Sequence, residues 1–187
     1  SVAVQGFGNA GFFIAKFMKE AGFKIVAVSD SKGGVYSEEG FDPDELMESK
    51  KKGELMGKKI SNSEILELDV DILLLAALEN QITGKNAKNV KASYIFELAN
   101  GPVTPEADEI LEKKKIEVMP DILTNAGGVT VSYFEWLQNR SGEYWKLEKV
   151  HEKLEEIMKV SYNEVEKIKS EKKIDYRTAA YVLALRR

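Results

Sequence analysis

Three glycines near the start of the sequence have the spacing best suited to chemistry. Gly6, Gly8 and Gly11 form a Gly-x-Gly-x-x-Gly pattern between an apolar stretch at residues 2–5 and a helical pattern from Phe12 onward. In a strand–turn–helix unit, the first glycine makes a tight turn, the second lets backbone approach a diphosphate, and the third lets helix and strand pack closely. The diphosphate then meets a helix N-terminus, which favours an anion. The pattern predicts a dinucleotide-binding turn, with a purely structural turn as the alternative.

An acidic residue closes the next predicted strand. Residues 24–30 are rich in β-branched side chains and end in Asp30, 24 positions after Gly6. A carboxylate about 20 residues beyond such a turn can accept hydrogen bonds from the ribose hydroxyls of adenosine. It also repels a 2′-phosphate and so favours NAD over NADP, whereas Ser31 and Lys32 could hold that phosphate. The choice between NAD and NADP stays open, and a solvated aspartate in a turn is the alternative for Asp30.

Further polar or glycine-rich segments follow the other predicted strands. Strands are predicted at residues 69–77, 92–99 and 116–119, and the segments at their ends are 76–81, 97–102 and 121–128. In a doubly wound sheet, ligands bind beyond the carboxyl ends of the strands. We therefore expect these segments, the glycine turn and Asp30 to meet at one edge of the sheet.

The elements that position these segments alternate between strand and helix. Helices are predicted after Gly11, from Asp42 and Pro43, at residues 61–66 and at 104–115, while residues 48–59 are expected to be a solvated surface excursion. This alternation favours an α/β fold, a Rossmann-type doubly wound and mostly parallel sheet.

Helices are predicted for the last third of the sequence. They cover residues 129–137, 145–169 and 176–187, with Asp175 as a cap for the last one. We expect two parts, a dinucleotide-binding domain at residues 1–140 and a C-terminal helical extension at 141–187 that packs on it.

Composition excludes several classes of protein. Among 187 residues, 43% are hydrophobic, 31% are charged, and the net charge is −4. This balance gives no basic footprint for nucleic acid, and no apolar run reaches the roughly 18 residues of a membrane-spanning helix. The absence of cysteine excludes disulfides and thiolate metal sites and fits a cytoplasmic protein. His151 is the only histidine, so no metal site is predicted, and a packed or surface role is expected for it.

Five stretches carry a resemblance to a known family. QGFGNAG, AVSDSKGGVY, AALENQIT, ANGPVTPEAD and PDILTNAGGVTVSYFEW together resemble the nucleotide-binding domain of the glutamate dehydrogenase family, over essentially the whole chain. The resemblance implies a two-domain, usually hexameric enzyme that oxidatively deaminates glutamate to 2-oxoglutarate and ammonia with NAD or NADP. It also implies that the catalytic lysines and aspartate belong to an N-terminal domain outside this chain. Since the sequence opens inside a strand, we expect a piece of a longer protein.

The resemblance also assigns roles to individual residues. It implies a diphosphate loop formed by Gly6, Phe7, Gly8, Asn9 and Ala10, and an adenosine-ribose site formed by Asp30 and Ser31. It implies that the backbone of Ala76 and Ala77 lies beside the nicotinamide ribose and that Asn100 and Asn125 make polar contacts to the nicotinamide end. It also implies that the hydroxyl of Ser132 meets the substrate's distal carboxylate. Helix capping is the alternative for Asn125, and a hydroxyl that faces solvent or a neighbouring helix is the alternative for Ser132. Leu75 and Leu98 depart from the family pattern, which tends to have proline and glycine there.

Two other functions remain open at this point. A related dehydrogenase for leucine, phenylalanine or valine would share much of the pattern, although an apolar substrate would suit alanine or valine better than Ser132. A non-catalytic nucleotide-binding module is the other alternative. We expect the isolated chain to bind cofactor without turning over glutamate, and part of the apolar face of residues 145–187 to be bare.

Overall fold

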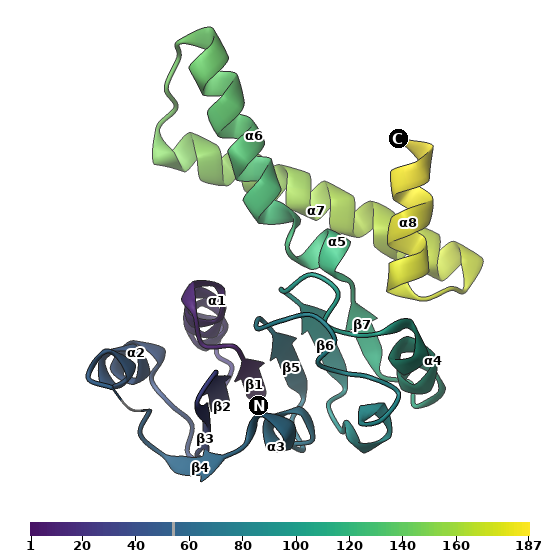
Figure 1. Ribbon diagram of the computed structural model, residues 1–187. Coiled ribbons are helices and arrows are strands. Elements are labelled where there is room, and N and C mark those ends of the chain that lie inside the picture. The colour runs from purple at the N-terminus through teal and green to yellow at the C-terminus, as the bar shows by residue number, and fades with distance from the viewer. Residues whose placement is uncertain (54) are drawn as a thin grey trace. The chain divides into compact units, whose positions relative to one another are not determined.

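The computed structural model describes residues 1–53 and 55–187, and it divides into two compact units (Figure 1). The first unit is Ser1–Val118 and the second is Met119–Arg187. The boundary expected at residue 140 between a nucleotide-binding domain and its extension stays a prediction.

A seven-stranded sheet organises the first unit. Its spatial order is β4-β3-β2-β1-β5-β6-β7. The strands are β1 (Val2–Gln5), β2 (Ile25–Asp30), β3 (Gly33–Tyr36), β4 (Lys58–Ile60), β5 (Ile72–Leu75), β6 (Tyr94–Glu97) and β7 (Glu117–Met119). Strands β2, β1, β5 and β6 pair in parallel, whereas β3 and β4 pair antiparallel at one side. The predicted Rossmann-type, mostly parallel fold is confirmed.

The course of the chain reverses between β1 and β5. Strand β2 lies on one side of β1, and the chain then returns to place β5 on the other side. In open α/β sheets the crevice beyond the carboxyl ends at such a switch point is where ligands bind. The glycine turn follows β1 directly and therefore lies at this point.

Alternation along the strands builds two cores, one on each face of the sheet. Val4, Val28 and Leu74 share a buried cluster with side chains of the helices α1 (Asn9–Glu20) and α2 (Pro43–Lys51). On the opposite face, inward side chains of the same strands pack with α3 (Asn62–Leu66), α4 (Pro105–Lys113) and the short 3-10 helix η1 (Ala87–Asn89). Burial on both faces explains why these strands are almost continuously apolar.

Side-chain caps begin the helices where the sequence predicts them. Asp42 accepts the N–H groups of Asp44 and Glu45 at the start of α2. A reciprocal capping box of Ser61 and Glu64 begins α3. Such caps satisfy N–H groups that have no partner within the helix, and each contributes about 1 kcal/mol.

The second unit contains only helices after residue 119. They are α5 (Asp121–Thr124), α6 (Ala126–Ser141), α7 (Leu147–Lys172) and α8 (Tyr176–Arg186). Asp175 caps α8 as predicted. A small core joins α5, α7 and α8, formed by Leu123, Val165, Ile168, Tyr176, Ala179 and Ala180.

One sequence-based expectation about local structure is incomplete and another is wrong. Residues 48–59 are mostly exposed, as expected, but they also contain the last turn of α2 and the start of β4; Glu54 lies outside the described residues. Helix α6 begins at Ala126 rather than near residue 129, so Gly127 and Gly128 belong to its first turn.

Candidate functional site

The turn after β1 has a backbone geometry that only glycine fits at its first position. Gly6 has φ +95°, and a Cβ added there would lie 2.5 Å from the carbonyl carbon of Ala76. The N–H groups of Gly6 and Phe7 both donate to the carbonyl of Ser29, at 2.9 and 2.6 Å. The turn is therefore fixed between the ends of β2 and β5.

Of the other two glycines, Gly11 lies in tight packing and Gly8 borders open space. A Cβ on Gly11 would lie 2.1 Å from the carbonyl oxygen of Gly6, so this position requires glycine for helix–turn contact. A Cβ on Gly8 would meet no atom within 4 Å. Gly8 is the N-cap of α1, which has no side-chain cap and no acidic residue in its first turn. The first N–H groups of α1 therefore face a space that suits an anion.

The remaining loop residues differ in what they offer. Asn9 and Ala10 are exposed at the start of α1, whereas the Phe7 side chain is fully buried and packs edge-on against Phe12. Phe7 therefore contributes backbone to the loop and its ring to the core.

Asp30 is held from three sides at the end of β2. One oxygen, Oδ1, accepts the Lys32 N–H at 2.8 Å, and the other, Oδ2, lies 3.3 Å from Lys50 Nζ. The Asn62 amide donates to the Asp30 carbonyl at 2.9 Å. Lys50 Nζ also donates to the Phe7 carbonyl at 2.6 Å. A single lysine thus links the glycine turn to the predicted ribose carboxylate.

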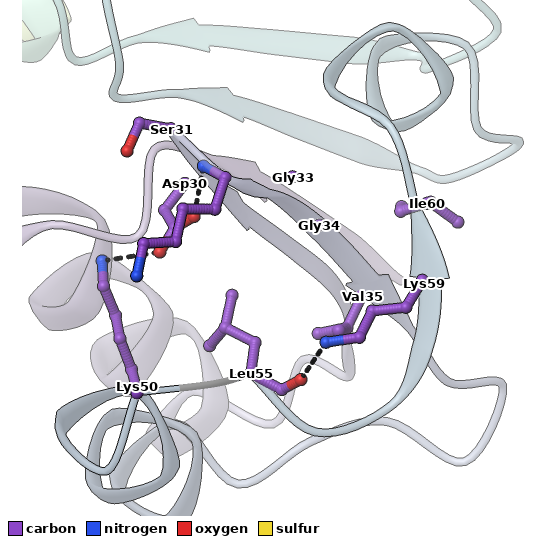
Figure 2. Close-up of a pocket in the computed structure, with 11 residues that line it drawn as sticks. Asp30, Ser31, Gly33, Gly34, Val35, Lys50, Leu55, Lys59 and Ile60 are labelled. Carbon is purple, nitrogen blue, oxygen red and sulfur yellow. Dashed lines mark hydrogen bonds and ion pairs between the residues drawn. The ribbon is translucent and has the colours of Figure 1, made fainter.

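A pocket of about 640 Å³ opens around Asp30 (Figure 2). The figure shows the Lys50 side chain reaching Asp30, and Lys59 bonded to the carbonyl of Leu55. The lining of the pocket also includes Ser31 and Lys32, followed by Gly33, Gly34, Val35, Gly53 and Ile60. Apart from Asp30, the charged side chains of this lining that the structure describes are lysines.

Sequence reasoning missed Lys50 and Lys59. Both lie in the stretch that was expected to be solvated. The available signal was the Asp42 cap, since a helix continued for two turns from Pro43 carries Lys50 in its last turn. That signal does not reveal which side of the sheet the helix covers.

A second hollow lies at the ends of β5 and β6. It has a volume of about 540 Å³ and is lined by Ala77, Leu78, Glu79, Asn80, Ala99 and Asn100. Main-chain bonds from Asn80 N–H to the Gly101 carbonyl, at 2.9 Å, and from Gln81 N–H to the Pro102 carbonyl, at 2.7 Å, hold the two segments together. The buried Gln5 amide at the end of β1 donates to Gln81 Oε1 at 2.8 Å.

The two departures from the family pattern leave the strand ends regular. Leu75 is fully buried in β5, and its carbonyl accepts the N–H groups of both Leu98 and Ala99. Among the described non-glycine residues, only Asn80, Lys115 and Lys173 have a positive φ. Leu98 therefore needs no glycine-like backbone conformation in this chain.

Two of the predicted site residues, Asn125 and Ser132, belong to the second unit. Asn125 lies between α5 and α6, and its N–H donates to the Asp121 carbonyl at 3.0 Å. It occupies the N-cap position of α6, but its side chain makes no capping hydrogen bond there. Helix capping therefore does not account for an asparagine at this position. Ser132 is exposed on α6, and its hydroxyl donates to the Gly128 carbonyl at 3.1 Å.

The first unit thus gathers all the predicted cofactor residues except Asn125. The glycine loop, Asp30 and Ser31, Ala76 and Ala77, and Asn100 all follow the carboxyl ends of neighbouring strands. His151 is exposed on α7. Across the described residues, no cluster of three metal-ligating side chains occurs, and no helix is long and apolar enough to cross a membrane.

The whole chain matches one family model, that of the glutamate/leucine/phenylalanine/valine dehydrogenases, over residues 1–187. A glutamate dehydrogenase of Thermotoga maritima is 54% identical over 193 aligned residues, covering 100% of this chain and 46% of the relative. An NADP-specific glutamate dehydrogenase of Synechocystis and a cryptic catabolic NAD-specific one of Bacillus subtilis are each 50% identical over the full chain, which covers 47% and 44% of them.

A solved structure agrees with these sequence relatives. The hetero-hexameric glutamate dehydrogenase of Thermus thermophilus, in its leucine-bound form, superposes with a TM-score of 0.93 at 34% identity, covering 99% of this chain and 45% of that one. The present chain therefore spans less than half the length of the relatives it matches. It belongs to the glutamate/leucine/phenylalanine/valine dehydrogenase family.

Proposed function

We propose that this chain is the cofactor-binding part of an NAD- or NADP-dependent glutamate dehydrogenase. The supporting observation is the glycine turn, in which Gly6 and Gly11 admit no side chain while Gly8 borders open space at a helix N-terminus. This arrangement fits a dinucleotide diphosphate. Relatives named as NAD-specific and as NADP-specific glutamate dehydrogenases support the choice of cofactor class.

Each predicted residue then has a physical role in binding. The loop N–H groups at residues 6–10 hold the diphosphate, and Asp30 and Ser31 accept the adenosine ribose. Ala76 and Ala77 provide backbone beside the nicotinamide ribose. The amides of Asn100 and Asn125 bind the nicotinamide end, because an amide both donates to and accepts from another amide.

The chain contributes orientation rather than acid–base chemistry. A bound oxidised nicotinamide would supply the hydride acceptor for oxidative deamination of glutamate to 2-oxoglutarate and ammonia. On substrate binding the Ser132 hydroxyl turns from the Gly128 carbonyl and donates to the distal carboxylate of glutamate. We assign no catalytic acid or base to this chain and place those groups in an N-terminal domain of the intact enzyme.

The assembly of the intact enzyme is part of the same proposal. We propose a homohexamer in the cytoplasm, with the substrate enclosed between this chain and the N-terminal domain. The hetero-hexameric enzyme of Thermus thermophilus supports six subunits. Closure between two domains would exclude water from the reacting carbon.

The second candidate is a dehydrogenase for an aliphatic or aromatic amino acid, because the matching family model includes enzymes for leucine, phenylalanine and valine. The exposed hydroxyl of Ser132 favours glutamate, since a distal carboxylate gains a hydrogen bond that an apolar side chain cannot use. A Ser132→Ala variant of the intact enzyme should raise the KM for glutamate and leave leucine turnover unchanged.

Titration of the purified 187-residue chain with NADH and NADPH tests the central proposal. We expect saturable enhancement of nicotinamide fluorescence and no steady-state oxidation of glutamate. A chain that binds neither nucleotide would refute the cofactor assignment. Turnover of glutamate by this chain alone would refute the assignment of acid–base chemistry to another domain.

A further inference from the structure

Lys50 occupies a position that links two parts of the proposed cofactor site. Its ammonium lies 2.6 Å from the Phe7 carbonyl in the glycine turn and 3.3 Å from the Asp30 carboxylate. The Lys50 side chain is 30% exposed, and that of Asp30 is 16% exposed. The pair is therefore partly withdrawn from solvent, where a charge interaction is screened less than at the surface.

The charge of Lys50 changes what Asp30 can accept. A bare carboxylate at the end of β2 repels a ribose 2′-phosphate, which carries about −1.5 to −2 charges at pH 7. Paired with Lys50, Asp30 loses most of that repulsion. Among the described residues of the lining, three ammonium groups, on Lys32, Lys50 and Lys59, lie around the Asp30 carboxylate.

Asp30 nevertheless retains the means to bind an unphosphorylated ribose. The Lys32 N–H fixes Oδ1 at 2.8 Å, which orients the carboxylate. Each carboxylate oxygen has more than one acceptor site, so Asp30 can still accept a ribose hydroxyl while it contacts Lys50.

We propose that Lys50 is a specificity-determining residue, which by pairing with Asp30 makes the adenosine site accept a 2′-phosphate, so that the chain binds NADP as well as NAD. This inference rests on the proposed dinucleotide function. It extends that function by naming the side chain that sets the tolerance at the 2′ position.

The two contacts of Lys50 have separable consequences. Its bond to the Phe7 carbonyl positions the diphosphate loop, which NAD and NADP use alike. Its charge beside Asp30 acts on the 2′ position, where only NADP carries a phosphate. The ratio of the two dissociation constants therefore reports the charge effect and cancels the shared positioning effect.

The experiment measures dissociation constants of NADH and NADPH for the 187-residue chain and four variants at one ionic strength. Wild type should bind both nucleotides within about tenfold of each other. Lys50→Met should weaken NADPH relative to NADH by about 10- to 100-fold, the range expected for one charged hydrogen bond. Lys50→Arg should restore most of the NADPH affinity.

Two further variants separate the local pair from general charge. Lys51→Met removes one positive charge from the same turn of α2 at an exposed position and should change both constants less than about twofold. The Asp30→Asn, Lys50→Met double variant removes both members of the pair. It should recover NADPH binding relative to Lys50→Met, because the uncompensated carboxylate is gone.

Specific outcomes would overturn the inference. A wild-type chain that binds NADH but rejects NADPH by more than about 100-fold refutes it, as does an equal loss of both nucleotides in Lys50→Met. A wild-type chain that binds neither nucleotide refutes the proposed function itself, which is a distinguishable result. Far-UV circular dichroism of each variant establishes that a lost affinity is not a lost fold.

Discussion

The two units of the chain differ in the cores that bury their apolar side chains. In the first unit, strands such as β1 and β5 are buried along their whole length, with a core on each face of the sheet. In the second unit, one small core joins α5, α7 and α8. Large apolar side chains stay exposed on its helices and connections, including Val129 at 71%, Tyr144 at 79% and Leu185 at 88%.

This difference concerns the cores and not every surface position. The first unit also exposes apolar side chains, among them Phe13 at 53%, Phe17 at 58% and Leu78 at 70%. Contiguous patches of exposed apolar side chains, unlike single ones, are typical of surfaces that another chain or domain covers. The exposed residues within 145–187 include Leu147, Ile157 and Val160, in line with the bare face expected from the sequence. The first unit therefore supplies a sheet with two cores beneath the proposed cofactor site, and the second unit leaves several large apolar side chains exposed.

The largest effect should come from the glycine turn of the first unit. Gly11→Ala places a Cβ 2.1 Å from the Gly6 carbonyl oxygen, and both atoms belong to backbone that cannot move independently. We expect a loss of about 4 kcal/mol or more in the free energy of unfolding. Urea unfolding followed by far-UV circular dichroism measures it.

Gly8→Ala is the matched control for that variant. Its Cβ meets no protein atom within 4 Å, so stability should change by less than about 1 kcal/mol. Affinity for NADH should fall at least tenfold, because the methyl group enters the space assigned to the diphosphate. Unchanged NADH affinity in Gly8→Ala would place the diphosphate elsewhere.

A buried position in the first unit and an exposed position in the second test the comparison directly. Ile95→Ala removes a fully buried side chain from β6 and should cost about 2–5 kcal/mol. Leu185→Ala acts on a side chain that is 88% exposed and should change the stability of this chain by less than about 0.5 kcal/mol. A comparable loss in both variants would show that Leu185 is buried in solution, contrary to the comparison.

The glycine turn and the helix starts could be predicted because their causes are local. Gly6 needs a positive φ, and Asp42, Ser61 and Asp175 each cap a helix through bonds to the next few residues. The parallel order of the central strands followed from the alternation of apolar strands with helices. These features depend on neighbours in sequence, and so single-sequence patterns contain them.

The role of Lys50 could not be predicted, because it depends on tertiary placement. Lys50 is 43 residues from Phe7 and 20 from Asp30, and it meets both only because α2 packs on the same sheet face as α1. The prediction of where α6 begins was wrong for a different reason. Glycine disfavours helix by about 1 kcal/mol per residue, yet Gly127 and Gly128 are helical here.

Nucleotide binding should stabilise one unit and not the other. ADP lacks the nicotinamide end, and its proposed contacts lie within Ser1–Val118. At 100 times its dissociation constant, ADP should stabilise the first unit by about 2.7 kcal/mol. Both tryptophans, Trp136 and Trp145, lie in the second unit, so their fluorescence follows that unit separately. A matching shift in the tryptophan transition would show that the units unfold together.

The smallest expected effect is a pH dependence of the second unit. Hydrogen bonds from the Tyr176 hydroxyl and from Ser170 lower the pKa of the Glu166 carboxyl below its usual value of 4.5. Burial raises the pKa of Tyr176, so its hydroxyl stays protonated and remains a donor. Because the pKa of Glu166 is lower in the folded state, its contribution is present above about pH 4.5 and is lost as the pH falls through the folded-state value.

Glu166→Gln should therefore destabilise the second unit at pH 7 by less than about 1 kcal/mol, since the carboxylate is only partly buried and is screened by solvent. The difference from wild type should shrink as the pH falls through the lowered pKa of Glu166, below which the wild-type carboxyl is also uncharged. Urea unfolding followed by tryptophan fluorescence between pH 3 and pH 7 measures it, with Glu152→Gln as an exposed control on the same helix. A difference that stays constant to pH 3 would mean that Glu166 stabilises the α7–α8 pair by shape and hydrogen bonding, not by its charge.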